Sequence, residues 1–269
     1  MSRRHSLVDV LRSTVRYVPE LVWPRTCSSC RERGAWVCAH CLAAIPLAHE
    51  PWCLRCGSGT CTCSSLPSGI AVARSVGPHD GWLAAAVHRL KYEGESARAR
   101  PLGEAMAPLL ARVMADEPTA VIVPVPLHPR RERQRGYNQS LLVAHAAAGP
   151  WRGSLTPAAL RRVRPTAQQV GLSPIERAGN VAGAFAADID LVAGRPIVLI
   201  DDVLTTGSTV AACAMVLHDA GAAAVAVVTL TRANWNARAW AGQCGSAAIR
   251  DPGLGLSPRP GIRDPDRLD

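Results

Sequence analysis

The sequence predicts an α/β protein in which a doubly wound parallel sheet follows a small cysteine-rich module. Short apolar runs rich in Val and Ile alternate with amphipathic segments between residues 70 and 232. Eight of the ten cysteines fall between Cys27 and Cys63. Hydrophobic residues make up 48% of the 269 residues and aromatic residues only 4%, so we expect a core of Ala, Val and Leu in which helices pack on a Val-rich sheet.

The order of the elements follows from this alternation. Strands are predicted at 70–76, 120–125, 196–200 and 224–230, and helices at 80–90, 102–114, 131–148 and 208–220. The run 120–125 is apolar and β-branched, as expected of a strand buried on both faces, and Pro124 and Pro126 mark its end. Because strand, helix and strand in succession require a crossover connection, the sheet is expected to be parallel.

The remaining segments flank this α/β domain of residues 70–232. Apolar positions at intervals of three and four predict an amphipathic helix within residues 1–24, which packs on the protein or, alternatively, lies on a membrane surface. Residues 25–66 form the cysteine-rich module, and residues 233–269, with many Gly, Pro, Arg and Asp, are predicted to be disordered. No segment has the length and hydropathy of a membrane span or a secretory signal, so we predict a cytoplasmic protein.

The formal net charge of +9 is concentrated in two groups of arginines. Such groups attract polyanions, either nucleic acid or a phosphate-rich small molecule, although any single arginine is as well explained by a solvated surface. The groups are Arg130, Arg131, Arg133 and Arg135, and Arg161, Arg162 and Arg164.

The spacing of the cysteines predicts zinc ligation in a reducing compartment. Two Cys-x2-Cys pairs seven residues apart match a tetrahedral structural site, and four further cysteines offer a second site whose last pair is shortened. The chain is therefore expected to hold one or two structural zinc ions, with His40 and His49 as alternative ligands. The first group is Cys27, Cys30, Cys38 and Cys41, and the second is Cys53, Cys56, Cys61 and Cys63.

The stretch Val198–Thr209 has the features of a sugar-phosphate site. A buried strand is expected to end at Asp201 and Asp202, and ligands of open α/β sheets sit beyond such strand ends. The small hydroxyl residues of Thr205–Thr209 can direct backbone N–H groups and a helix N-terminus at a phosphate, and Gly207 lets the backbone come close. Two carboxylates beside a phosphate site would accept hydrogen bonds from the hydroxyl groups of a ribose.

This stretch resembles the phosphoribosyl pyrophosphate motif of type I phosphoribosyltransferases. With four neighbouring segments in the same order, the chain resembles the ComF family over residues 27–232. The segments are HRLKYEG at 88–94, VPVPLHPR at 123–130, RGYNQ at 135–139 and QVGLSPIER at 169–177. The resemblance implies a type I phosphoribosyltransferase-like fold preceded by a double zinc ribbon.

The same resemblance implies where phosphoribosyl pyrophosphate binds. Residues 125–130 resemble the loop that holds the pyrophosphate, and residues 168–177 resemble a flap that closes over the reacting centre. Asp201, Asp202, Arg130 and Arg131 are the expected catalytic residues, and Mg²⁺ is expected with the pyrophosphate. The expected ligand contacts are Asp201, Asp202, Val203, Leu204, Thr205, Thr206, Gly207, Ser208, Thr209, Val125, Pro126, Leu127 and His128.

Two functions are compatible with these residues. In the first, the protein transfers a phosphoribosyl group to an acceptor that the sequence does not name. In the second, the fold is a scaffold or sensor, and the cysteine module and arginines hold single-stranded DNA during uptake or repair, together with a competence helicase. Release of pyrophosphate with a base, or oligonucleotide binding with a steep salt dependence, distinguishes the two hypotheses.

Overall fold

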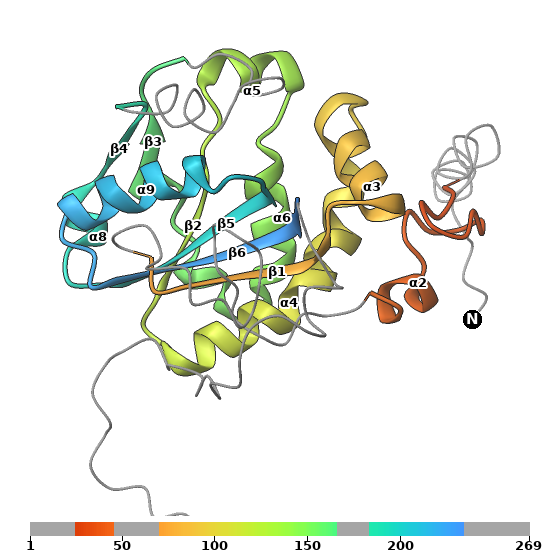
Figure 1. Cartoon of the computed structure of the whole chain (residues 1–269), viewed down its shortest axis with the longest axis horizontal. Helices are drawn as coiled ribbons and strands as arrows, with labels where there is room; N and C mark the ends of the chain where they lie inside the picture. Colours follow the sequence, from red (N-terminus) through yellow and green to blue (C-terminus); the bar gives the residue numbers. More distant parts are fainter. Residues whose placement is uncertain (1–24, 46–69, 166–182, 234–269) are drawn as a thin grey trace, which may run out of the picture.

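The computed structural model describes residues 25–45, 70–165 and 183–233. Within these residues, a parallel sheet is covered by helices on both faces (Figure 1). Several predictions lie outside the described residues: the N-terminal helix, the second cysteine group, the flap at 168–177 and residues 234–269 of the tail. In the described part, no helix combines the length and hydropathy needed to cross a membrane.

The central sheet has the strand order β1-β6-β5-β2, and all neighbouring strands run parallel. Its strands are β1 (Val72–Pro78), β2 (Val121–Pro124), β5 (Pro196–Leu204) and β6 (Ala224–Arg232). All four residues of β2 are buried, which explains its continuous apolar sequence. The predicted α/β class with a parallel sheet is confirmed.

Each face of the sheet belongs to a different hydrophobic core. Val198 and Ile200 of β5 pack with α3 (Gly81–Tyr92), α4 (Ala99–Asp116) and α6 (Gln139–Ala148). Ile197 and Leu199 face the opposite way and pack with α8 (Ile189–Val192) and α9 (Ser208–Asp219). Because side chains alternate along a strand, a strand with apolar residues at every position can serve both cores.

Helices α4 and α6 approach each other closely at Gly103. A Cβ atom at this position would lie 2.7 Å from the carbonyl oxygen of Val143 and would also overlap the side chain of Ala146. Only glycine allows the two helices to pack at this distance.

The predicted single helix at 131–148 is wrong, because the chain forms two helices there, α5 (Pro129–Arg135) and α6. Gly136 adopts a left-handed conformation with φ of 85° and ends α5. The side chain of Asn138 then accepts hydrogen bonds from the backbone N–H groups of Ser140 and Leu141 and begins α6.

Two further features differ from the prediction. Strand β5 continues to Leu204, past the predicted end at residue 200, so Asp201 and Asp202 lie within the strand, where Asp201 pairs with Thr229 of β6. A separate antiparallel pair, β3 (Leu160–Arg162) and β4 (Phe185–Ala187), was not predicted, because strands of three residues carry too little alternation to be recognised.

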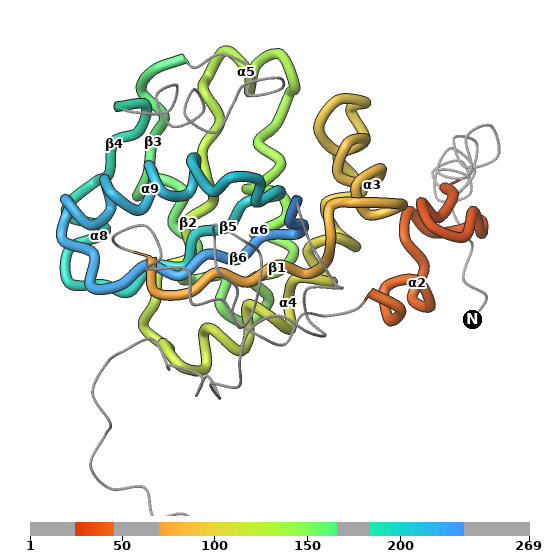
Figure 2. Tube along the Cα trace, in the orientation of Figure 1, coloured from red at the N-terminus to blue at the C-terminus, as the bar shows by residue number. Residues whose placement is uncertain are grey.

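The cysteine-rich module packs against α3 and contains the short helix α2 (Ala39–Ala43). Figure 2 shows the module beyond α3, on the side away from the β3–β4 pair. Trp82 of α3 contacts the small cluster that contains Cys27 and Cys41, and Ile45 joins the core beneath α3 and α4. The module and the α/β domain therefore share apolar contacts.

Candidate functional site

A cleft of about 480 Å³ opens where the parallel strands end. Its wall is formed by the end of β5, the turn into α9, helix α3, the loop after β2 and His79, which follows β1. The lining residues are His79, Val87, His88, Lys91, Tyr92, Val125, Pro126, Leu127, Arg131, Arg135, Gln139, Arg162, Asp201, Asp202, Val203, Leu204, Thr205, Gly207, Thr209 and Val210. This position is the one expected for ligands of parallel α/β sheets.

The turn between β5 and α9 lines this cleft through Thr205, Gly207 and Thr209. Gly207 has φ of 80°, a left-handed conformation that side chains disfavour. The first hydrogen bond of α9 runs from Ala211 N to Gly207 O over 2.8 Å, so the N–H groups of residues 208–210 have no acceptor within the helix. The hydroxyl groups of Thr206 and Ser208 are 2.8 Å apart beside them. Such a turn suits a phosphate.

Asp201 is held by two hydrogen bonds inside the protein. Its Oδ1 atom accepts from Ser140 Oγ and from the backbone N–H of Asp202, both over 2.9 Å. Burial and the negative charge of Asp202 nevertheless raise the pKa of Asp201 to about 7. Near neutral pH, this carboxyl group is therefore close to its titration midpoint.

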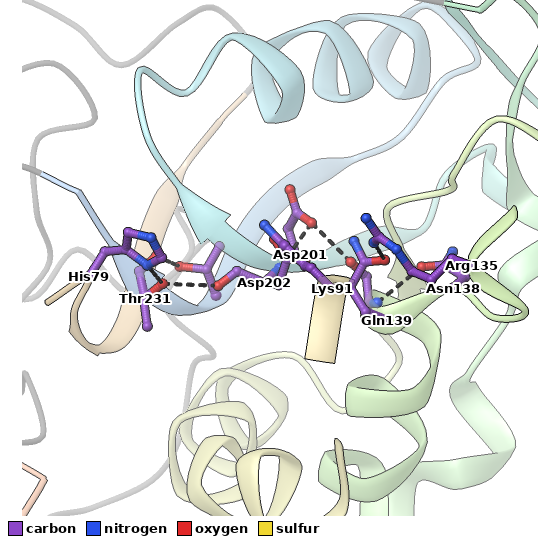
Figure 3. A network of polar contacts seen from close by, with 10 residues as sticks. His79, Lys91, Arg135, Asn138, Gln139, Asp201, Asp202 and Thr231 are labelled. Atoms are coloured by element: carbon purple, nitrogen blue, oxygen red, sulfur yellow. Dashed lines mark hydrogen bonds and ion pairs between the residues drawn. The ribbon is translucent and has the colours of Figure 1, made fainter. Parts of the chain in front are cut away.

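Asp202 forms an ion pair with a lysine from a distant helix (Figure 3). Lys91 Nζ of α3 lies 2.8 Å from Asp202 Oδ1, and the side chain of Asp202 is only 4% exposed. Its other oxygen, Oδ2, is buried without a hydrogen-bond partner among the described residues. The Thr231 hydroxyl donates to the backbone oxygen of Asp202 over 3.4 Å and is itself 2.8 Å from His79 Nδ1.

Two arginines bring positive charge to the cleft. Arg131 lies in the first turn of α5, and Arg162 of β3 lies with its guanidinium carbon 5.1 Å from the centre of the Phe185 ring. Burial lowers the pKa of Arg162, and the positive charge of Arg131 lowers it further. Two cations held this close together make a favourable environment for an anion.

The RGYNQ segment explains how the parts of the cleft are joined. The hydroxyl of Tyr137 donates to the backbone oxygen of Leu90 in α3 over 2.6 Å. Asn138 Nδ2 donates over 3.1 Å to the backbone oxygen of Val125, in the loop after β2. Gln139 accepts a hydrogen bond from Arg135. Asn138 also caps the N-terminus of the following helix, α6.

The cleft brings together most of the ligand contacts expected from the sequence. Among the described residues, four of the expected site residues do not line the cleft: Thr206, Ser208, Arg130 and His128. The side chain of His128 instead accepts from Arg130 N and begins α5.

Sequence reasoning gave no role at this site to His79, Lys91 and Ser140, and it placed Arg162 only in a group of basic residues. Lys91 lies in the HRLKYEG segment, which contributed to the family resemblance but was given no role at the site. Nothing local in the sequence distinguishes Ser140 from other residues at the start of a helix.

The first cysteine group forms a compact cluster in the module. The sulfur atoms of Cys27, Cys30, Cys38 and Cys41 all lie within 4.8 Å of one another. The sulfurs of Cys30 and Cys38 are 3.7 Å apart, close to the roughly 3.8 Å that a tetrahedron of Zn–S bonds of about 2.3 Å requires. The four residues thus fit a structural zinc ion with no position left for a substrate.

Backbone groups also favour thiolate at one of these cysteines. Burial acts to raise the pKa of Cys27, but the N–H groups of Cys38, Cys30 and Ser29 outweigh it and lower that pKa to about 6. For Cys30, a backbone hydrogen bond from Glu32 acts to lower the pKa, whereas burial and the neighbouring thiols raise it to about 12. Four thiols so close together favour a cation that neutralises them.

The fold and these two sites define an α/β protein with a ligand cleft at the strand ends and a four-cysteine module. No family model matches the chain. DNA utilization protein YhgH of Escherichia coli strain K12 is 34% identical over 229 residues, which cover 80% of this chain and 98% of that protein. Competence protein F of Haemophilus influenzae is 34% identical over 42% of this chain and 50% of its own length.

A further relative is more distant: competence protein ComFC of Bacillus subtilis is 26% identical over 77% of this chain and 84% of its own length. The chain belongs to the ComF family, which includes these DNA-utilization and competence proteins. The family resemblance found in the sequence is confirmed.

Proposed function

We propose that this protein binds phosphoribosyl pyrophosphate in the cleft and transfers its phosphoribosyl group to an acceptor. The observation that carries this proposal is the buried pair Asp201 and Asp202, which directly precedes the left-handed turn at Gly207 and the N-terminus of α9. One end of the cleft thus suits a phosphate and its centre suits ribose hydroxyl groups. We further propose that the domain has a type I phosphoribosyltransferase-like fold.

Each part of the ligand has a counterpart in the cleft. The 5-phosphate would accept from the backbone N–H groups at residues 205–209, and the ribose hydroxyls would donate to the two carboxylates. The pyrophosphate would lie against residues 125–127, near Arg131 and Arg162. Charge-assisted hydrogen bonds from arginine to phosphate are among the stronger polar contacts in proteins, which supports this orientation.

The reaction exchanges one bond at the anomeric carbon. The bond between C1 of the ribose and the pyrophosphate oxygen breaks, and its electron pair leaves with the pyrophosphate. A nucleophilic atom of the acceptor forms the new bond to C1 and loses its proton to solvent or a base. Arg131 and Arg162 would stabilise the charge that develops on the leaving group. Mg²⁺ carried by the pyrophosphate would neutralise part of the same charge.

Calorimetric titration of phosphoribosyl pyrophosphate with Mg²⁺ tests this proposal directly. Wild-type protein is expected to bind, and Asp202→Asn should weaken binding about tenfold or more, because a charge-assisted hydrogen bond contributes roughly 1.5–3 kcal/mol. A coupled assay for released pyrophosphate, run with the common nucleobases, tests transfer. A wild-type protein that is folded by circular dichroism and does not bind the ligand would refute the proposal.

A second candidate function is a role in DNA uptake or utilization, and the names of the relatives favour it. Arg130 and Arg133 lie exposed on α5, and Arg161 and Arg164 lie exposed at and after β3. Such a surface suits the phosphate backbone of a single strand. In this role the protein would act with a competence helicase.

Fluorescence anisotropy with a labelled single-stranded oligonucleotide tests this second function. Binding should weaken steeply with salt, and Arg130→Ala with Arg133→Ala should lower the salt slope by about 0.7 for each phosphate that these two arginines neutralise in the wild type. Arg112→Ala, in α4, is the control at another basic site. Salt-independent binding, or no binding, would argue against a direct contact with DNA.

A further inference from the structure

The ion pair between Lys91 and Asp202 lies inside the proposed ribose site. Only 20% of the lysine side chain and 4% of the aspartate side chain are exposed, so the charges are poorly screened by water. The lysine ammonium is 2.8 Å from one carboxylate oxygen, Oδ1. The second oxygen, Oδ2, is buried with no hydrogen-bond partner among the described residues, and Asp202 lines the cleft.

The protein holds this lysine in place from two sides. Val87 and Leu90 belong to the same helix, α3, and their side chains are fully buried where α3 packs on the core. The Tyr137 hydroxyl fixes the backbone oxygen of Leu90, next to Lys91 in the chain, over 2.6 Å. The end of α3 is thereby tied to the turn that also holds the loop after β2 through Asn138. The position of the ammonium group is thus set by packing that does not involve a ligand.

The ammonium group of Lys91 lies beside two adjacent carboxyl groups, those of Asp201 and Asp202. Two adjacent buried carboxylates repel each other, and burial removes the water that would weaken this repulsion. The ammonium group of Lys91 offsets part of the repulsion and binds one oxygen of Asp202, which leaves the other oxygen to accept.

We infer that Lys91 is a positioning residue for ribose recognition: it holds Asp202 in the orientation in which Asp202 Oδ2 accepts a hydrogen bond from a ribose hydroxyl. This inference rests on the proposed function of the cleft. Lys91 acts through Asp202 and not on the phosphates, so its removal should affect ligands that contain ribose far more than ligands that consist of phosphate alone.

The test is calorimetric titration of three ligands: phosphoribosyl pyrophosphate with Mg²⁺, ribose 5-phosphate and inorganic pyrophosphate. The variants are Lys91→Met, Lys91→Arg, Asp202→Asn and the double variant Lys91→Met with Asp202→Asn. Arg89→Met is the matched control, because Arg89 lies on the same helix, pairs with Glu93 and does not line the cleft. Circular dichroism establishes that each variant is folded.

Lys91→Met should weaken binding of the two ribose ligands about tenfold or more, and Lys91→Arg should recover part of that loss because it restores the charge. Pyrophosphate binding by Lys91→Met should fall less than ribose binding, because the only effect on it is repulsion by the unpaired negative charge of Asp202. In the double variant, which has the net charge of the wild type, pyrophosphate binding should return to the wild-type value. Relative to pyrophosphate binding by the same variant, ribose 5-phosphate binding should stay no weaker than in Asp202→Asn alone.

Several outcomes would overturn the inference without touching the proposed function. If wild type binds phosphoribosyl pyrophosphate and Lys91→Met binds the ribose ligands equally well, the lysine has no part in recognition. Tighter binding by Lys91→Met would mean that the lysine competes with the ribose. Pyrophosphate binding that stays weak in the double variant would mean that Lys91 contacts phosphate directly. If wild type binds none of the three ligands, the proposed function itself fails.

Discussion

The guanidinium carbon of Arg98 lies 4.5 Å from the centre of the Trp36 ring, so a cation of the α/β domain stacks on an aromatic ring of the cysteine-rich module. The Arg98 side chain is fully buried, donates to the Ser28 hydroxyl and to the Trp36 backbone oxygen, and pairs with Glu95. Arg98 ends the short 3₁₀ helix at Ser96–Arg98, between α3 and α4. This one side chain therefore joins the module to the helices beside the cleft.

We predict that Arg98→Met lowers the free energy of unfolding by about 1–3 kcal/mol. Methionine keeps much of the volume but cannot donate, so the partly buried Ser28 hydroxyl and Trp36 oxygen each lose a hydrogen bond. Chemical denaturation measures the change. Zinc release to a chelator should also become faster, because the module loses its main polar contact with the domain.

The control for this prediction is Arg100→Met on α4. Arg100 pairs with Glu104, but its side chain is 85% exposed, so the change should stay within about 0.5 kcal/mol. Equal stability of Arg98→Met and Arg100→Met would mean that the buried arginine does not stabilise the junction.

Metal content tests the four-cysteine cluster. Cys38→Ser should lower the zinc content by one ion per chain, because it removes one of four ligands whose sulfurs lie within 4.8 Å of one another. Cys213→Ala serves as the control, since Cys213 is buried in α9 and outside this cluster. Elemental analysis of both proteins gives the answer. Unchanged zinc in Cys38→Ser would place the metal elsewhere.

The sequence allowed the central fold to be predicted because its signals are local and repeated. The run Val121–Pro124 is apolar at every position and ends at proline, and this requires a strand buried on both faces. The break between α5 and α6 was missed because the charged residues of α5 carry no apolar pattern that could show where this helix ends. The helix ends at Gly136 by a left-handed turn, which the pattern of hydrophobic residues does not reveal.

The candidate site was predictable where it is contiguous in sequence and not where it is assembled by folding. Asp201, Asp202 and Gly207 stand within seven residues of one another, and the chemistry of such a string can be inferred directly. Lys91 meets Asp202 across 111 positions of the chain, and only the packing of α3 against the sheet brings them together. The link between Arg98 and Trp36 is equally hidden, because neither residue belongs to a pattern of its own.

The pKa of Asp201 predicts how stability depends on pH. Burial and the charge of Asp202 raise this pKa from 3.8 to about 7, so the folded protein binds the proton more tightly than the unfolded chain does. The contribution of this group is therefore fully present below pH 3.8, declines as the pH rises, and is lost above about pH 7.

Asp201→Asn replaces the carboxyl group by a neutral amide and should remove this decline. The free energy of unfolding of the variant minus that of wild type should therefore be larger at pH 8 than at pH 5. Denaturant unfolding of the ligand-free proteins measures both values. A difference between the two proteins that is independent of pH would contradict a raised pKa. Asp190→Asn, on the short exposed helix α8, is the control that leaves the pH dependence in place.

The phosphate turn gives the last prediction. Gly207→Ala should cost roughly 1–2 kcal/mol of stability, because φ of 80° is unfavourable for a residue with a Cβ atom. It should also abolish binding of phosphoribosyl pyrophosphate, because the turn would lose the conformation in which its N–H groups can bind a phosphate. Gly221→Ala is a matched control at the other end of α9. Gly221 has φ of 86°, and a Cβ atom there would meet Ala193 at 3.5 Å, an ordinary contact distance, so the strain is similar but far from the cleft. Thermal unfolding should therefore show similar losses for both variants, whereas calorimetric titration should show binding by Gly221→Ala alone. If both variants bind the ligand as wild type does, the turn does not hold the phosphate; if both lose binding, backbone strain in α9 explains the effect and the phosphate contact is not supported.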